Sequence, residues 1–253
     1  MGIIIATFIS KVKTLGGIKK FLKILAKIAG VLVLLFIILV LILSIPAVQS
    51  SLGRYATDRI NSEFGTNINV EYVRLMLNGD VELKNVFIRD YKKDTLINVN
   101  SLSTSIYSFR NLTQGNLVFG DIVLDELTFN IKTHKGDSLT NLDVFINKFE
   151  NDNPPSEQPF LMSSSDVSIN DGIFRLIDEN KETPNILEFK DLNLNATNFV
   201  INGPVVEARI NTMQFIDRRG MRLNNLTTNF KFTPSSMDFK ALKIRTQESN
   251  LDG

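Results

Sequence analysis

The sequence NINVEYVRLMLNGDVELKNVFIRD, residues 67–90, decides the fold. Apolar and polar residues alternate in both of its halves, which is typical of β-strands with one buried face. The Asn78-Gly79 pair between the halves is a strong signal for a two-residue hairpin turn. We therefore predict an antiparallel β-hairpin whose strands each have one apolar face, made of Ile68, Val70 and Tyr72 in the first strand and Val81, Leu83 and Phe87 in the second.

The same alternation continues through most of the chain and predicts a mainly β protein with an elongated antiparallel sheet. A first β unit covers residues 66–150, residues 151–160 form a proline-containing linker, and a second β unit covers residues 161–253. Within the first unit, residues 140–150 favour a short helix over a strand, because their apolar residues share one helical face. The last strand has no closing element, so we expect the sheet to continue beyond this chain.

Upstream of the hairpin, residues 28–45 read IAGVLVLLFIILVLILSI, an apolar run interrupted only by Ser44. As a helix this run is roughly 27 Å long, close to the ~30 Å hydrocarbon core of a bilayer. A buried core helix is the alternative, but such helices are usually shorter and amphipathic. We predict a single transmembrane helix, whose anchor residues are Leu32, Leu35, Phe36, Ile38 and Leu41.

The distribution of charge predicts the topology of this anchor. Residues 1–45 contain six Lys and no acidic residue, so we expect the basic segment 1–27 to be cytoplasmic. A cleaved signal peptide is the rival interpretation, but its apolar region is usually only about 7–15 residues long. The rest of the chain has 22 basic against 27 acidic residues, a balance that argues against a nucleic-acid partner.

Residues 46–65 predict an amphipathic helix that begins at Pro46 and stops at Gly65. This helix either caps the sheet that follows or lies on the bilayer surface. We favour the cap, because strand sequence begins directly after Thr66. The predicted apolar face, with residues at spacings of three and four, consists of Val48, Leu52, Tyr55, Ala56, Ile60 and Phe64.

Residues suited to catalysis are scarce in this sequence. Cysteine is absent, which excludes thiolate nucleophiles and Cys-ligated metals. The one histidine, His134, lies in Thr-His-Lys-Gly-Asp, which we interpret as a solvated turn. Acidic pairs such as Asp125-Glu126 and Asp178-Glu179 are adjacent in sequence, so their side chains diverge. We expect no enzyme activity, no metal site and no cofactor.

The order of these elements resembles the start of TamB and AsmA-type envelope proteins. The resemblance rests on the phrase NGDVELKNVFIRD followed by DTLINVNSL, and on VSINDGIFRLIDEN followed by ILEFKDLNLN, an Asp-Gly strand followed by a Leu-x-Leu strand. It covers about residues 20–253, and the Asn-rich and Phe-rich composition is similar to Bacteroidetes-type members.

This resemblance implies an inner-membrane protein that projects a long, bent β-sheet into the periplasm. The sheet would form a trough with an apolar interior, and the expected role is outer-membrane biogenesis through transport of phospholipid between the membranes. An alternative role is assembly with an Omp85-type barrel partner in the outer membrane, without carrying lipid. A tethered scaffold without any ligand is the third possibility.

An apolar trough can hold lipid without specific polar contacts, since each buried CH₂ group of an acyl chain contributes about 0.8 kcal/mol. The same apolar positions also suit the closed core of an ordinary β-sandwich. The candidate groove-lining residues are Val167, Ile169, Leu192, Leu194, Ala208, Ile210, Phe230, Phe232, Met237 and Phe239.

Overall fold

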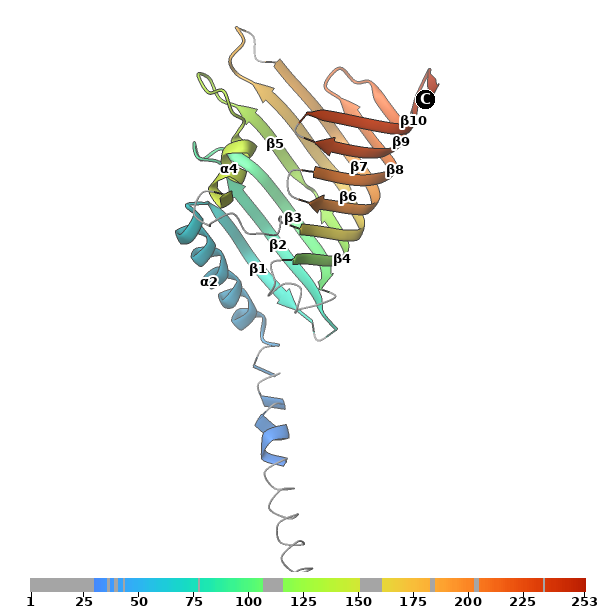
Figure 1. Ribbon diagram of the computed structural model, residues 1–253. Coiled ribbons are helices and arrows are strands. Elements are labelled where there is room, and N and C mark those ends of the chain that lie inside the picture. The colour runs from blue at the N-terminus through green and yellow to red at the C-terminus, as the bar shows by residue number, and fades with distance from the viewer. Residues whose placement is uncertain are drawn as a thin grey trace, which may run out of the picture. The chain divides into compact units, whose positions relative to one another are not determined.

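The computed structural model divides the chain into two compact units, Met1–Val48 and Gln49–Gly253 (Figure 1). It describes residues 30–35, 37–38, 41–42, 44–76, 78–106, 116–150, 161–182, 185–202, 205–233 and 235–253.

In the first unit, residues 30–35, 37–38 and 41–42 are helical. Four of the predicted anchor residues are described, and their exposed fractions are 61% for Leu32, 55% for Leu35, 43% for Ile38 and 62% for Leu41. Phe36 and the basic segment 1–27 lie outside the described residues. Among the residues that are described, no helix combines the length and the apolar character needed to cross a membrane. The transmembrane helix at residues 28–45 therefore stays a prediction.

The second unit is built around one sheet of eleven strands, with helices α2 (Pro46–Phe64) and α4 (Asn141–Glu150) beside it. Neighbouring strands follow the order β1-β2-β3-β4-β6-β7-β8-β9-β10-β11, and β5 pairs with β3 and β6. The prediction of a mainly β protein is confirmed. The strands are β1 (Ile68–Leu75), β2 (Asp80–Arg89), β3 (Thr95–Ile106), β4 (Asn116–Asp125), β5 (Thr128–Thr133), β6 (Leu161–Asp178), β7 (Asn185–Asn202), β8 (Val205–Asp217), β9 (Arg222–Thr233), β10 (Ser236–Thr246) and β11 (Asn250–Asp252).

Two strand pairings depart from the predicted antiparallel arrangement. Strands β4 and β5 both run parallel to β6, whereas the other pairings are antiparallel. The chain reaches β6 from β5 through α4, and a parallel pairing needs such a crossover connection. The two predicted β units consequently belong to a single sheet, and the linker at residues 151–160 lies outside the described residues.

Helix α4 confirms the short helix that was predicted near residues 140–150. Thr140 caps its start, since the Thr140 hydroxyl accepts a hydrogen bond from the backbone N–H of Asp143 at 3.1 Å. The Asp143 carboxylate in turn accepts one from the Thr140 N–H at 3.0 Å, which is the reciprocal arrangement of a capping box.

Helix α2 caps the free edge of β1, as predicted, but with polar side chains. The amide of Gln49 donates to the carbonyl of Leu75 at 2.9 Å and accepts from its N–H at 3.0 Å. Asn61 makes the same pair of bonds to Ile68 at 2.7 and 2.8 Å. The prediction of an apolar contact face was wrong, because Tyr55 is 73% exposed and Ile60 is 36% exposed. The backbone groups of an edge strand need hydrogen-bond partners, which apolar side chains cannot supply.

Gly53 allows α2 to approach β1 this closely, and its replacement by Ala is expected to push the helix away. A Cβ atom at position 53 would lie 2.2 Å from Cγ2 of Val73, well inside van der Waals contact. We expect Gly53→Ala to lower the free energy of unfolding by about 1–3 kcal/mol, measured by urea unfolding of the purified protein. Asp58→Ala, at an exposed position of the same helix, is the control and should change stability by less than about 0.5 kcal/mol. An equal effect of both substitutions would contradict this account.

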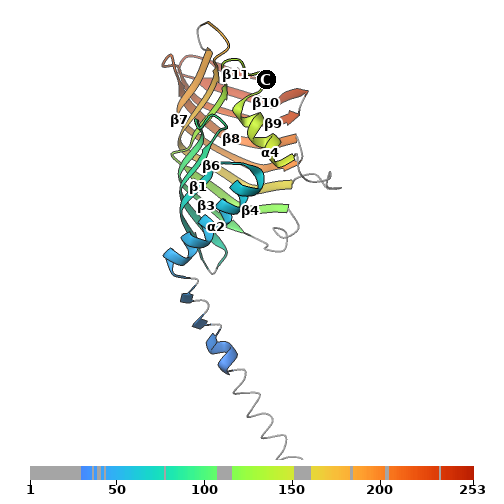
Figure 2. The same cartoon turned by 90° about the vertical axis from the view of Figure 1, so that its left-hand side faces the viewer.

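The sheet is bent, and the bend interrupts the alternation of its strands (Figures 1 and 2). Val70, Val86 and Val99 form a buried cluster, and Val73, Leu83 and Leu102 pack against the same cluster. In each of β1, β2 and β3, two of these residues lie three positions apart, so one extra residue shifts which side chains face inward. We call the face that carries these six residues the concave face, because side chains from both sides of the bend meet there.

Because of the bend, two details of the predicted hairpin were wrong. Tyr72 and Phe87 were expected on the apolar faces of their strands, but each lies next to a concave-face residue, Val73 or Val86, and so points to the opposite, convex face. There the Lys84 ammonium lies 5.9 Å from the Tyr72 ring centre, and the Arg89 guanidinium lies 5.0 Å from that of Phe87.

Candidate functional site: the concave face of the sheet

A continuous apolar row crosses the concave face. Residues directly opposite each other on paired strands share a face, so the strand register identifies the row. Its members, in order from β1 to β8, are Val73, Leu83, Leu102, Leu124, Ile169, Leu194 and Met213. A second, parallel row contains Ile122, Val167, Ala196 and Ile210.

All ten candidate groove-lining residues lie on this one face. Val167, Ile169, Leu194 and Ile210 belong to the two rows, and Leu192 lies opposite Gly172, whose added Cβ would contact Ile169. Ala208 pairs with Phe230, Phe230 with Phe239, and Phe232 with Met237, which extends the face over β9 and β10. Leu192 is buried, whereas Phe232, Met237 and Phe239 are exposed, with Met237 at 55%. The remaining six are half-buried: Val167, Ile169, Leu194, Ala208, Ile210 and Phe230.

Beyond the bend, the concave face carries a row of aromatic rings that sequence reasoning missed. Phe129 packs edge-on against Phe174, with ring centres 5.9 Å apart. Phe174 stacks on Phe189 at 5.8 Å, and Phe189 on Phe215 at 3.9 Å. Phe129 also pairs with Ile97, a member of the packed concave cluster. The sequence does contain a signal for this row, because Phe189 lies three positions before Leu192. A search for strict alternation, with a spacing of two, overlooks it.

The concave face is only partly buried among the described residues. Within the described ranges, the strands form one sheet, and a closed sandwich would need a second. Only eight hydrophobic side chains of the described residues are buried: Val70, Val86, Leu96, Val99, Ile122, Leu192, Ala196 and Leu223. Most side chains of the first row are therefore only partly shielded from solvent.

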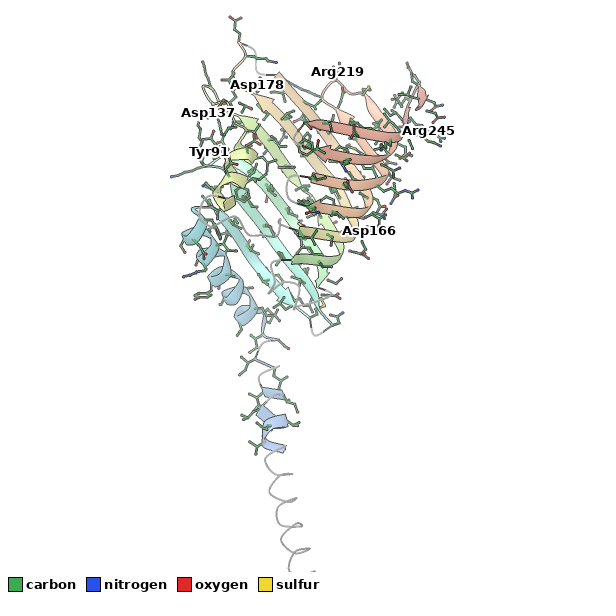
Figure 3. All side chains as sticks on the ribbon, in the orientation of Figure 1. Tyr91, Asp137, Asp166, Asp178, Arg219 and Arg245 are labelled. Carbon is green, nitrogen blue, oxygen red and sulfur yellow. The ribbon has the colours of Figure 1, made fainter. Side chains whose placement is uncertain are left out.

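The convex face is polar, and its side chains form hydrogen bonds with one another. Asp166, labelled in Figure 3, accepts hydrogen bonds from Asn195 at 2.9 Å and from Ser168 at 3.1 Å. Asn211 donates to the carbonyl oxygen of the Asn195 side chain at 2.9 Å. This arrangement explains the abundance of Asn and Ser in the strands, because polar side chains that bond to one another suit a face in contact with water.

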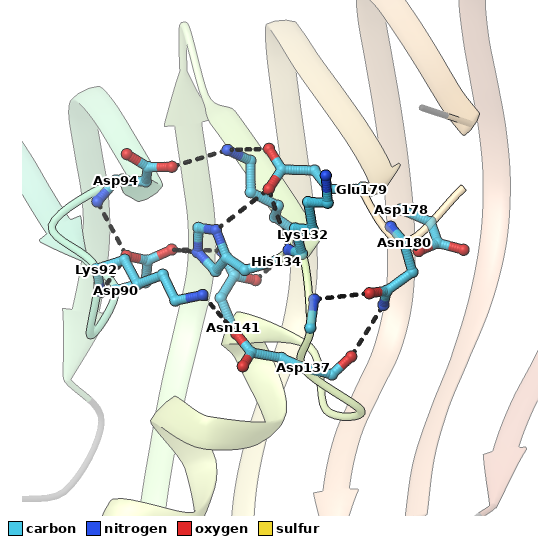
Figure 4. Close-up of polar contacts among 12 residues, drawn as sticks. Asp90, Lys92, Asp94, Lys132, His134, Asp137, Asn141, Asp178, Glu179 and Asn180 are labelled. Carbon is cyan, nitrogen blue, oxygen red and sulfur yellow. Dashed lines mark hydrogen bonds and ion pairs between the residues drawn. The ribbon is translucent and has the colours of Figure 1, made fainter. Parts of the chain in front are cut away.

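A second candidate site is a polar cluster at one end of the sheet (Figure 4). We call it the polar clasp: Asp90, Asp94, Lys132, His134, Asn141 and Glu179. His134 Nε2 lies 2.8 Å from Asp90 Oδ2, and His134 is only 4% exposed. The prediction of a solvated turn at His134 was therefore wrong, because residues distant in sequence enclose it.

The carboxylate of Asp90 is the centre of the polar clasp. It accepts hydrogen bonds from the backbone N–H groups of Lys92 and Asp94, both at 2.9 Å, and from Asn141 at 3.1 Å. Burial raises the pKa of Asp90, but the hydrogen bonds from His134, Asn141 and the backbone outweigh it and hold that pKa below its ordinary value. Asp90 is thus a buried carboxylate that stays ionised.

Asp90, Asp94 and His134 place possible metal-ligand atoms within 4.8 Å of one another. The ammonium of Lys132 already lies among these acidic groups, 2.8 Å from Asp94 and 2.9 Å from Glu179. These carboxylates raise the pKa of Lys132 although its partial burial acts in the opposite direction. A bound dication would have to displace this cation, so the arrangement fits a structural tie better than a metal centre.

The polar clasp connects four segments: the turn after β2, the end of β5, the start of α4 and the turn after β6. Tyr91 and Asp137, next to α4 in Figure 3, extend it through a hydrogen bond. Burial and the neighbouring Asp137 raise the pKa of Tyr91 to about 12, so its hydroxyl stays a donor. The acidic pair Asp178-Glu179 contributes through Glu179 to this tie.

These features define a class: a single-sheet β protein with a partly exposed apolar concave face and a polar convex face. Neither a protein-family model nor a curated protein matches this chain.

Proposed function

We propose that this protein is a membrane-anchored β-groove protein that binds the acyl chains of phospholipid on its concave face. The observation that carries this proposal is the unbroken, partly exposed apolar row from Val73 to Met213. Soluble proteins rarely leave a large contiguous apolar surface open, and such a surface marks a binding site.

The row is more than long enough to cover one acyl chain. Its residues lie on seven neighbouring strands, which at a spacing of about 4.8 Å extend over roughly 29 Å. Each leaflet of a bilayer has acyl chains about 15 Å long, half of the ~30 Å hydrocarbon core. Burying each CH₂ group contributes about 0.8 kcal/mol, so a chain of lipid length is held without charged partners.

The predicted anchor at residues 28–45 would hold this groove beside a membrane. With the basic N-terminus in the cytoplasm, the sheet would lie in the periplasm, as in the TamB and AsmA-type proteins that the sequence resembles. We propose the same role, transport of phospholipid between the inner and outer membranes.

A second candidate function is assembly with an outer-membrane barrel partner of the Omp85 type. Strand β11 pairs with β10 only from Lys243 to Arg245. Within the part of the chain that the structure describes, Ser236–Lys240 of β10 pair on one side only, with β9. A partner strand added to this edge would complete the ladder, and crosslinking from Asp238 would capture the partner.

Lipid extraction distinguishes the two functions. We expect phospholipid to copurify with the full chain isolated in mild detergent, at about one molecule or more per protein, measured by mass spectrometry. A periplasmic protein without an apolar groove, purified in the same detergent, is the control. Protein that carries no more lipid than this control, together with an Asp238 crosslink to a barrel protein, would favour the assembly function instead.

A further inference from the structure

The bend of the sheet follows a row of irregular residues that crosses the strands at one level. Four residues other than glycine adopt the left-handed backbone region in this row: Asn85 (φ 51°), Glu126 (φ 53°), Asp171 (φ 52°) and Asp191 (φ 49°). They lie in β2, between β4 and β5, in β6 and in β7. Each occupies the extra position between two concave-face residues, as Glu126 does between Leu124 and Leu127.

Hydrogen bonds on the convex face link these positions from strand to strand. Asn85 donates to the carboxylate of Glu71 on β1, and Asn100 on β3 donates to Glu126 at 3.2 Å. Asn170 on β6 donates to Asp125 at 2.8 Å, and Asn193 on β7 accepts from the N–H of Asp171 at 3.3 Å. Asn85, Glu126 and Asp171 therefore each have a partner on a neighbouring strand. The carbonyl of Asp191 accepts a hydrogen bond from Asn193 of the same strand at 3.0 Å.

The four left-handed residues destabilise the sheet, because a side chain in this backbone region costs roughly 1–2 kcal/mol per residue. Such a cost is expected where the conformation has a structural role. Asn and Asp tolerate that region better than other residues with a side chain. Val70, Val86 and Val99 are buried at the same level, so packing of the concave face acts together with the left-handed residues. Gly172 adds a tight approach at the same level, where an added Cβ would lie 2.8 Å from Ile169 Cγ2.

We propose that this row is a built crease, which sets the angle between the two halves of the sheet and thereby the width of the apolar concave face. The crease consists of the four left-handed residues together with Glu71, Asn100, Asp125, Asn170 and Asn193. The left-handed residues turn β2, β6, β7 and the junction of β4 with β5, and the convex hydrogen bonds keep these turns aligned with β1 and β3. On the proposed function, the crease positions both apolar halves around one acyl chain, but its effect on the sheet does not depend on any ligand.

The absence of cysteine makes the angle measurable with two introduced labels. Ser165 and Leu176 are exposed and lie on β6 on either side of Asp171, eleven positions apart. In a straight strand they would be about 36 Å apart, at about 3.3 Å per residue. Spin labels on Ser165→Cys and Leu176→Cys are expected to show a shorter distance by double electron–electron resonance.

Two matched sets of substitutions test the cause of the bend. Replacing Asn85, Glu126, Asp171 and Asp191 by Gly preserves access to the left-handed region, whereas replacing the same four by Val removes it. We expect the Gly set to keep the wild-type distance and the Val set to shift toward about 36 Å. If the Val set does not fold while the Gly set keeps the wild-type distance, the proposal stands, because the left-handed conformation is what separates them. A folded Val set with the wild-type distance would overturn it.

A third variant tests the hydrogen bonds separately. Asn100→Ala, Asn170→Ala and Asn193→Ala together remove convex partners and leave the left-handed residues in place. We expect a broader distance distribution than in the wild type, and an unchanged distribution would overturn the role of these bonds. Bound phospholipid measured on the same samples reports on the proposed function independently, since the distances are decisive even for protein that carries no lipid.

Discussion

Asp90→Ala is expected to lower the free energy of unfolding by about 3–5 kcal/mol, because it removes the buried centre of the polar clasp. The substitution leaves the side chains of His134 and Asn141 and two backbone N–H groups without their acceptor. Buried donors that lose their partners cost about 1–3 kcal/mol each, partly relieved by water that enters the site. Urea unfolding followed by circular dichroism measures the loss.

Asp94→Ala is the matched control for this substitution. Its carboxylate bonds to Lys132, but the side chain is 49% exposed, so we expect a loss of no more than about 1 kcal/mol. Asp90→Asn keeps the shape of the side chain and some of its acceptors. Its loss of unfolding free energy should lie between those of Asp90→Ala and Asp94→Ala. If Asp90→Ala were no more destabilising than Asp94→Ala, the polar clasp would not be a structural tie.

The contribution of Asp90 also depends on pH. Its pKa in the folded protein is lower than the value of 3.8 for an unperturbed Asp. The stabilisation is therefore fully present above pH 3.8 and is lost as the pH falls through the lower, folded-state pKa. Titrating the unfolding free energy from neutral to acidic pH should show this loss in the wild type and a smaller one in Asp90→Asn.

Leu194→Asp is expected to reduce the copurifying phospholipid at least about tenfold, because a carboxylate on the apolar row must lose its water when an acyl chain covers it. Leu194 lies between Ile169 and Met213 in the row and is only half-buried, so the protein itself should still fold. Mass spectrometry of extracted lipid gives the ratio to the wild type.

Asn229→Asp is the control for the groove, since it places the same charge on the convex face. Asn229 is exposed and pairs with Arg209 and Lys240, two cations that accommodate a carboxylate. The Asn229→Asp substitution should leave the amount of bound lipid unchanged. A folded Leu194→Asp protein with wild-type lipid content would argue that acyl chains bind elsewhere.

Local sequence signals predicted much of the fold. The Asn78-Gly79 pair correctly indicated the β1–β2 hairpin, and alternation marked the strands beside it. The predicted two-residue turn was wrong, because β1 ends at Leu75, β2 begins at Asp80, and the Met76 N–H donates to the Asp80 carbonyl at 2.8 Å. The short helix α4 followed from the spacing of its apolar residues and from its cap at Thr140. The ten candidate groove residues share one face, since within each segment the alternation is unbroken. Their role in lining a lipid groove stays a prediction.

Signals that depend on distant partners were missed or misread. His134 looked like a solvated turn residue because its neighbours in sequence are polar, yet its partner Asp90 is 44 positions away. Helix α2 was assigned an apolar contact face, whereas Gln49 and Asn61 bind the edge of β1 with their amides. Neither contact has a local signature, since any exposed polar residue presents the same pattern.

The sequence by itself determined that the chain forms long strands with one apolar and one polar face, since alternation is a property of each strand alone. Only the tertiary structure decided how those faces join. An apolar pair three positions apart, such as Leu83 and Val86, is ambiguous in one strand, but the same break at one level in neighbouring strands makes a crease. Register between strands sets that level, and register is a property of the assembled sheet.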